Sequence, residues 1–154
     1  MNHYFFDSRG RVKRYIKEVG NQWVTGILED KSNNRILVAR ITEAESNSAF
    51  ARLVREKIWT SAEANLQQKQ LKKHFRHEYR VISVTVLVVQ QAIEFLHQHP
   101  LRAYDAIQLA GAVLTNIRLV QQLKPPLTFV SGDKRLLTVA STIGLKVEDP
   151  NAYP

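Results

Sequence analysis

The chain of 154 residues contains no cysteine, so disulfide bonds, thiolate nucleophiles and cysteine-ligated zinc or iron–sulfur centres are excluded together. Any metal must therefore be held by oxygen or imidazole ligands. No run approaches the roughly 18 apolar residues that a membrane-spanning helix needs, and no basic segment leads into an apolar stretch near the N-terminus. The sequence therefore predicts a protein of the cytoplasm.

Glycine-rich and other signature motifs of several α/β enzymes are also missing. There is no Gly-x-Gly-x-x-Gly or Walker loop, so we expect no nucleotide cofactor. There is no Gly-x-Ser-x-Gly element, which excludes the usual acyl-transfer serine. Asp7-Ser8-Arg9 lacks the second acid that receiver domains and aspartyl phosphatases place beside their phosphoacceptor.

Acidic residues are outnumbered, with 14 Asp and Glu against 22 Lys and Arg, which gives a formal net charge of +8. A basic field attracts phosphate backbones and speeds their encounter with the protein. Net charge also serves solubility, so charge alone indicates a nucleic-acid ligand only weakly.

Short apolar runs alternate with segments of helical periodicity along the whole chain. We predict strands at 4–6, 35–40, 81–84 and 127–130, with a further edge strand at 145–148. Helices are predicted at about 12–16, 23–28, 42–58, 61–75, 89–96, 102–114 and 136–140, the 89–96 segment on a stripe of Val89, Ala92, Ile93 and Leu96. This order indicates one α/β domain over residues 1–154 with a mostly parallel sheet of four to five strands.

Four acidic residues lie where a strand gives way to a helix or within the first turns of a helix. They are Asp7, Glu45, Asp105 and Asp133. In an alternating chain such positions converge outside the carboxyl ends of the strands. Carboxylates gathered there repel one another and raise one another's pKa unless a cation lies between them. The sequence therefore predicts a site for Mg²⁺ or Mn²⁺.

Each acid also has a purely structural explanation. Thr42 and Glu45 have the spacing of a capping box, with Thr42 as the N-cap. Asp105 could complement a helix dipole, and Asp133 could be a turn residue after Ser131-Gly132. Capping, however, needs one acid per helix and does not require all of them on one edge of the sheet. The expected position of all four acids on one edge of the sheet therefore favours the metal site.

The ordered motifs resemble the PIN domain family over essentially the full length, and most closely its VapC-type toxins. The matching segments are Asp7-Ser8, Thr42-x-x-Glu45, Tyr104-Asp105-Ala106-Ile107-Gln108-Leu109-Ala110 and Phe129-Val130-Ser131-Gly132-Asp133-Lys134-Arg135-Leu136-Leu137. The resemblance implies a three-layer α/β/α fold and a ribonuclease that depends on Mg²⁺ or Mn²⁺. It also implies a homodimer and inhibition by a cognate antitoxin protein.

Position by position, Asp7, Glu45, Asp105 and Asp133 match the family's catalytic and metal-binding acids, and Ser8 matches its hydroxyl residue. This chain departs from the family at Arg9-Gly10-Arg11, ahead of Val12-Lys13-Arg14-Tyr15. The added cations could strengthen RNA binding, and the expected RNA contacts are Ser8, Arg9, Arg11, Lys13 and Arg14. The alternative is a catalytically silent PIN-like module that binds RNA or a protein partner.

Two further expectations concern the helices at 42–58 and 61–79. Their apolar residues Phe50, Ile58, Trp59 and Phe75 are expected to contribute to an antitoxin groove, with the homodimer on another helical face. The alternative is a monomer that buries all of them internally. His74 and His77 lie in a cationic stretch, which favours a solvated or RNA-facing helix end over a zinc site.

Overall fold

Five parallel strands form one sheet in the order β3-β2-β1-β4-β5 in the computed structural model, which describes residues 1–154. The strands are β1 (Asn2–Phe6), β2 (Asn34–Ala39), β3 (Arg80–Ile82), β4 (Leu127–Val130) and β5 (Lys146–Glu148). The parallel sheet and the edge position of β5 confirm the prediction. Because β1 is central, its carboxyl end lies between those of β2 and β4.

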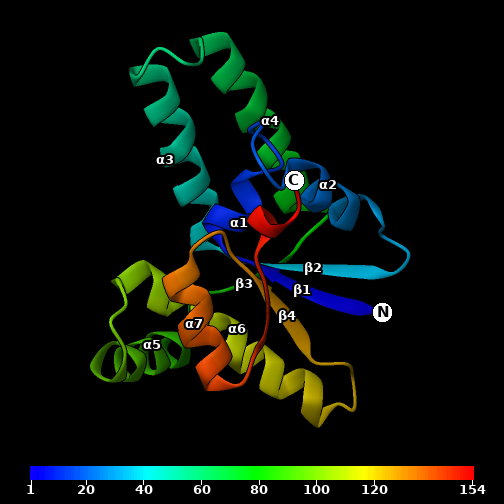
Figure 1. Ribbon diagram of the computed structural model, residues 1–154, viewed down its shortest axis with the longest axis vertical. Coiled ribbons are helices and arrows are strands. Elements are labelled where there is room, and N and C mark those ends of the chain that lie inside the picture. The colour runs from blue at the N-terminus through cyan, green and yellow to red at the C-terminus, as the bar shows by residue number, and fades with distance from the viewer.

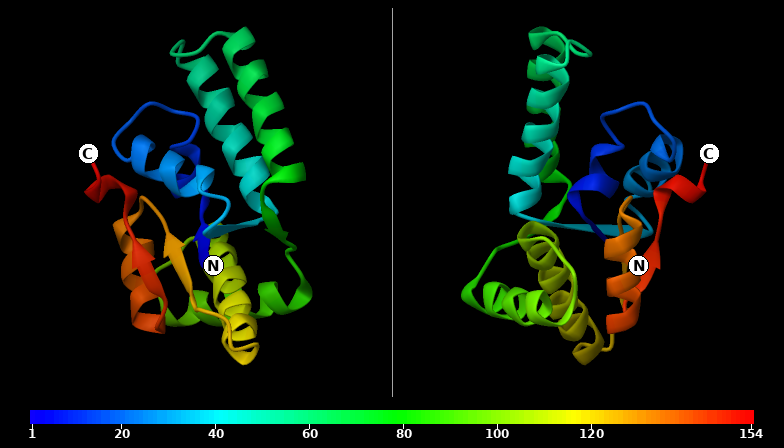
Figure 2. Two further views of the ribbon diagram at one scale, coloured as in Figure 1. Left: turned by 90° about the vertical axis from the view of Figure 1, so that its right-hand side faces the viewer. Right: turned by 60° about the vertical axis from the view of Figure 1, so that its left-hand side comes forward.

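Seven α-helices connect and cover the strands. They are α1 (Ser8–Val12), α2 (Asn21–Glu29), α3 (Ile41–Arg55), α4 (Ser61–His77), α5 (Val86–Gln98), α6 (Ala103–Gln121) and α7 (Lys134–Ile143), followed by the 3₁₀ helix η1 (Pro150–Ala152). Helices α3 and α4 form a long hairpin that projects from the body, while α5, α6 and α7 lie on the other side of the sheet (Figures 1 and 2). None of the helices has the length and apolarity needed to cross a membrane.

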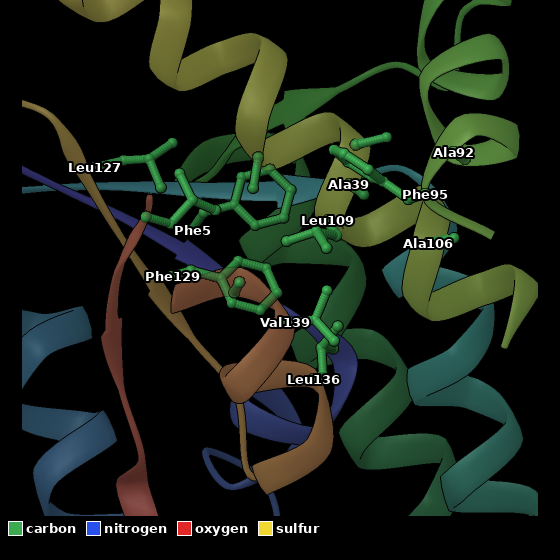
Figure 3. Close-up of a cluster of buried hydrophobic side chains, with 14 of the residues drawn as sticks. Phe5, Ala39, Ala92, Phe95, Ala106, Leu109, Leu127, Phe129, Leu136 and Val139 are labelled. Atoms are coloured by element: carbon green, nitrogen blue, oxygen red, sulfur yellow. The ribbon is translucent and has the colours of Figure 1, made fainter. Parts of the chain in front are cut away.

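The two faces of the sheet carry separate hydrophobic cores. Successive side chains of a strand point to opposite faces, so Phe5 and Phe6, both fully buried, enter different cores. Phe5 and Phe129 pack with α5, α6 and α7 (Figure 3). Phe6 packs with residues of α2, α3 and α4. These layers confirm the three-layer α/β/α arrangement.

Capping residues explain the ends of several helices. Asp133 accepts hydrogen bonds at the start of α7, and Gly144 ends this helix with a φ of 104°, a conformation that favours glycine. Thr60 and Glu63 form a capping box at the start of α4. The capping box predicted at Thr42 is wrong. Helix α3 begins at Ile41, so Thr42 already lies inside the helix, where it is fully buried.

Helix α1 lies about four positions earlier than the helix predicted at 12–16, because it ends at Val12 and leaves Tyr15 and Ile16 outside it. The side-chain amide of Asn21 donates to the carbonyl oxygens of Lys13 at 2.5 Å and Ile16 at 3.4 Å. These bonds satisfy carbonyl groups that a continuing helix would have used. A residue from the start of α2 therefore ends the first helix.

The apolar stripe predicted for α5 is also wrong. The residues that face the core are Val88, Ala92 and Phe95. The side chains of Val89, Ile93 and Leu96 are 39%, 48% and 38% exposed, so most of the predicted stripe faces solvent. Apolar residues occur on both faces of this helix, and periodicity alone did not identify the one that packs on α6.

Most apolar residues predicted to form an antitoxin groove belong to the core. Phe50 is fully buried and Phe75 is 6% exposed. Trp59 is partly buried and packs on Phe50, with ring centroids 5.3 Å apart. Only Ile58, beyond the end of α3, is strongly exposed, at 63%. These residues therefore stabilise the α3–α4 hairpin and do not form a continuous docking surface.

Candidate active site

Asp7 lies at the centre of the sheet's carboxyl edge, directly after β1, and caps α1. Its side chain accepts hydrogen bonds from the Gly10 backbone N–H at 2.7 Å and from Ser131 Oγ at 2.6 Å. Burial raises the pKa of Asp7 to about 7; these two hydrogen bonds oppose the rise, and the charges of Asp105 and Glu45 add to it. Asp7 therefore keeps its proton to a higher pH than an exposed aspartate does when no cation is bound.

Gly10 allows α1 to approach the sheet closely enough for this arrangement. A Cβ atom at Gly10 would lie 2.8 Å from the carbonyl oxygen of Val130, at the end of β4. Any side chain at this position would therefore displace α1 from β4. The glycine of the Arg9-Gly10-Arg11 departure is thus required by packing at the site.

Asp133 approaches the same edge from the start of α7. Its backbone N–H donates to Ser131 Oγ at 3.0 Å, and that hydroxyl in turn donates to Asp7. Its carboxylate accepts from the Arg135 backbone N–H and forms a 2.5 Å ion pair with Arg9 Nη1. Asp133 therefore has both a capping role and a charged partner.

Asp105 lies in the first turn of α6 and forms no capping hydrogen bond of its own. Burial raises the pKa of Asp105, the cation of Arg9 opposes the rise, and the charges of Asp133 and Glu45 add to it. Each of the four acids thus lies within electrostatic range of at least one other. The convergence expected from strand order is present, while its catalytic meaning stays a prediction.

Glu45 is held by a residue that the sequence reasoning missed. Nε2 of Gln108 lies 3.0 Å from Glu45 Oε1, 2.7 Å from Thr42 Oγ1 and 3.2 Å from Ser8 Oγ. Gln108 is 1% exposed, so this amide is a fixed part of the interior. A polar residue three positions after Asp105, within an otherwise apolar helical run, was the signal that could have identified it.

A groove of about 390 Å³ leads from Glu45 along α3. Its polar and charged lining comprises Ser8, Arg9, Glu45, Ser48, Arg52 and Arg55. Arg52 and Arg55 were missed, although Glu45, Ser48, Arg52 and Arg55 are spaced by three or four positions and so share one helix face. A row of cations therefore begins beside the carboxylates.

The structure does not support three of the five expected RNA contacts. Arg11 is fully buried, with its guanidinium 4.3 Å from the Tyr79 ring centroid. Lys13 is 5% exposed and donates to Glu18 and to the Val19 carbonyl oxygen. Arg14 forms a 2.9 Å ion pair with Glu78. Of the five, Ser8 and Arg9 line the groove.

The four acids suit a hard divalent cation by donor type, because carboxylate oxygens are the ligands that Mg²⁺ and Mn²⁺ prefer. Their mutual effects on pKa indicate negative charges in need of a counterion. No three His, Asp or Glu side chains, however, meet closely enough to form a ready ligand group. The four carboxylates therefore have the right donor atoms for Mg²⁺ or Mn²⁺. They do not lie close enough together to form a complete coordination sphere.

Comparison with solved structures identifies the fold. FitAcB from Neisseria gonorrhoeae matches with a TM-score of 0.63 and 17% identity, over 96% of this chain and 97% of that one. VapBC2 from Rickettsia felis, solved with a promoter DNA fragment, matches with a TM-score of 0.64 and 14% identity, over 96% and 98%. VapC20 from Mycobacterium tuberculosis, described as a toxin that cleaves the sarcin–ricin loop, matches with a TM-score of 0.60 and 15% identity, over 98% and 99%.

No protein-family model and no curated protein sequence matches the chain. Sheet order, layers and full-length superposition together show that this chain has the PIN-domain fold of the VapC-type toxins.

Proposed function

We propose that this protein is a metal-dependent endoribonuclease of the cytoplasm and the toxin of a toxin–antitoxin pair. The observation that carries the proposal is the position of four acids at one sheet edge, directly beside a groove lined by arginines. The groove would attract a phosphate backbone and the acids would bind the cation that phosphodiester cleavage requires. The fold shared with VapC-type toxins supports the same reading.

Asp7, Glu45, Asp105 and Asp133 would hold Mg²⁺ or Mn²⁺, which when bound lowers the pKa of a water molecule and neutralises charge on the scissile phosphate. The protein's own groups have separate roles. Arg9, Arg52 and Arg55 bind phosphate oxygens on the approach to the acids. Glu45 is held by Gln108 in the lining of the groove, where its carboxylate would bind the metal or, instead, orient the attacking water.

A second candidate, the catalytically silent PIN-like module, is favoured by one observation. The 2.5 Å ion pair with Arg9 supplies Asp133 with a positive charge from the protein itself. If the Arg9–Asp133 ion pair persists when RNA is bound, the Asp133 carboxylate is not free to bind a metal ion. The chain would then bind RNA through its groove without cleaving it.

The proposed partners are an antitoxin protein and a second copy of this chain. The solved VapBC2 and FitAcB structures support the antitoxin. The second copy is proposed to dock on α5, where Val86, Leu87 and Ile93 are 73%, 60% and 48% exposed. Helix α5 contains no Lys or Arg, so an apolar contact there adds little to the repulsion between two chains that each carry a net charge of +8. Sedimentation at micromolar concentration tests this, and a wild-type monomer, or a dimer that persists in Leu87→Glu, would contradict it.

The function is tested by cleavage of a generic single-stranded RNA with and without Mn²⁺. Wild-type protein should cleave only with the metal, and Asp105→Asn should abolish cleavage while the fold survives. Because the ionised Asp105 carboxylate is disfavoured by burial, the apo variant should melt at an equal or higher temperature. Glu29→Gln, which removes an exposed charge before β2, is the matched control and should cleave normally.

Calorimetric Mn²⁺ titration separates the two candidates. Binding to wild-type protein that weakens in Asp105→Asn supports the enzyme. RNA binding without Mn²⁺ binding or cleavage would reject it in favour of the silent module. Full cleavage by Asp105→Asn would show that Asp105 only stabilises the start of α6.

A further inference from the structure

A second basic hollow lies at the opposite edge of the sheet from the candidate active site. It has a volume of about 570 Å³, and its charged or titratable lining includes His3, Arg35, Arg76, Arg80, Lys124 and Glu78. His3 is near the start of β1 and is paired in register with Arg35 of β2. In Figure 1 the N-terminus lies at the end of β1 that points away from α1. Asp7 is four positions after His3 along extended chain, a distance of roughly 13 Å.

The cations of this hollow have no acidic partners in the protein. Arg35, Arg76, Arg80 and Lys124 take part in none of the ion pairs of the structure. The one carboxylate in the lining, Glu78, is already bonded by Arg14 at 2.9 Å and by Lys31 at 3.0 Å. The hollow therefore has a positive field, because its single carboxylate is already paired with two cations that do not line it.

One ring nitrogen of His3 is buried in the lining of this hollow without a hydrogen-bond partner. Its side chain is 9% exposed, and its Nδ1 atom is buried without a hydrogen-bond partner. A buried polar atom without a hydrogen bond is unfavourable, so such an atom requires an explanation. Burial lowers the pKa of His3, the charges of Lys124, the N-terminal amine and Arg35 lower it further, and a hydrogen bond with the Pro125 backbone opposes them. An anion in the hollow would offset these charges and change the environment of the His3 imidazole.

We propose that this hollow is a binding site for phosphate groups, separate from the candidate active site and independent of the proposed nuclease. Three arginines, from β2, the end of α4 and the start of β3, contribute to the lining. Guanidinium groups form two parallel hydrogen bonds with phosphate oxygens, so several of them together suit a ligand with more than one phosphate. The volume falls within the range of about 300–1,000 Å³ typical of small-ligand sites.

Two sources could supply this chemistry, a free polyphosphate or the backbone of an RNA strand. The first arm of the test is calorimetry with inorganic tripolyphosphate at low salt, combined with NMR of the His3 imidazole. Tripolyphosphate should bind and shift the His3 resonances. Arg80→Gln and Lys124→Gln should each weaken binding at least about fivefold. Lys69→Gln removes the same charge from an exposed position of α4 outside both hollows and should leave binding unchanged.

The second arm uses a short RNA oligonucleotide and the Asp105→Asn background, so that cleavage plays no part. Weaker RNA binding in the Arg80 and Lys124 variants would identify RNA as a source. Unchanged RNA binding, with the tripolyphosphate result above, would assign the site to free polyphosphate. Three results would overturn the proposal: no tripolyphosphate binding, equal weakening by Lys69→Gln, or equally tight binding of an oligoglutamate peptide. None of these results depends on whether the protein cleaves RNA.

Discussion

Gln108 and Glu45 lie 63 positions apart, and Nε2 of Gln108 donates a 3.0 Å hydrogen bond to Oε1 of Glu45. The same nitrogen lies 2.7 Å from Thr42 Oγ1, one turn earlier on α3. This amide therefore joins the helix that carries Asp105 to the helix that carries Glu45. The buried amide of Gln108 thus fixes the Glu45 carboxylate, which lies on an otherwise accessible face of α3.

The first prediction concerns the coupling between Gln108 and Thr42, both buried. Gln108→Leu and Thr42→Val should each destabilise the fold by about 1–3 kcal/mol, because each leaves polar groups of the other residue with fewer partners. The double variant should lose clearly less than the sum, since both polar partners are then replaced. Urea unfolding of the four proteins measures this. Strictly additive losses would show that the hydrogen bond contributes no coupling.

Features that depend on local sequence were predicted well. The strands are short runs of buried side chains such as Phe5 and Phe129. Because helices alternate with them along the chain, the strands could be predicted to run parallel, as they do. Because parallel strands end at one edge, the acids that follow them, Asp7 and Asp133 in particular, could be placed there before the structure was known. Their positions were thus predictable, while their chemistry still awaits measurement.

Features that depend on distant partners were not predictable. Thr42 has the sequence signature of an N-cap, yet its hydroxyl bonds to Gln108 of another helix. Arg11 reads as a surface cation, yet the rings of Tyr15 and Tyr79 lie 4.9 Å and 4.3 Å from its guanidinium. The contacts of Thr42 with Gln108 and of Arg11 with Tyr79 join segments far apart in the chain, so no local periodicity reveals them. Tertiary packing overrode the local preference in both cases.

The second prediction separates chemistry from capping at Glu45. Glu45 does not form the predicted capping box, so Glu45→Gln should leave the unfolding free energy within about 0.5 kcal/mol of wild type. If Glu45 serves cleavage, activity should fall at least about tenfold, which corresponds to roughly 1.4 kcal/mol. Thr60→Ala, which removes the capping box of α4, should show the reverse, with about 1 kcal/mol of lost stability and unchanged activity. Parallel losses of stability and activity in Glu45→Gln would make Glu45 a structural residue.

The third prediction concerns the groove along α3. Arg52→Gln and Arg55→Gln should weaken binding of a fluorescent single-stranded RNA in the Asp105→Asn background, because each removes a cation from the groove. Each should also reduce the slope of log affinity against log salt by about 0.7, the value for one phosphate contact on a single strand. Lys69→Gln is again the control of equal charge. Identical slopes in all the proteins would place the RNA elsewhere.

The last prediction concerns His74, whose side chain is 9% exposed and whose Nδ1 atom lies 2.6 Å from the Tyr15 hydroxyl. Arg11 donates to the same hydroxyl, so neutral His74 is the natural acceptor for the Tyr15 proton. The pKa of His74 is lowered from 6.5 to about 4, chiefly by burial, with the cations of Arg14, Arg11 and Lys31 contributing and Glu78 opposing them. The unfolded chain therefore binds this proton more tightly than the folded protein does.

It follows that the stability linked to neutral His74 is complete above about pH 6.5 and is lost as the pH falls toward about 4. Between pH 7 and pH 5 the unfolding free energy of the wild-type protein should fall by an amount on the order of 2 kcal/mol. In His74→Gln the same fall in pH should cost less, because the group that must be kept neutral is absent. His77→Gln, at an exposed position one turn along α4, should keep the wild-type dependence. Urea unfolding at pH 7 and pH 5 decides the matter, and identical pH dependence in wild type and His74→Gln would show that His74 is not the group responsible.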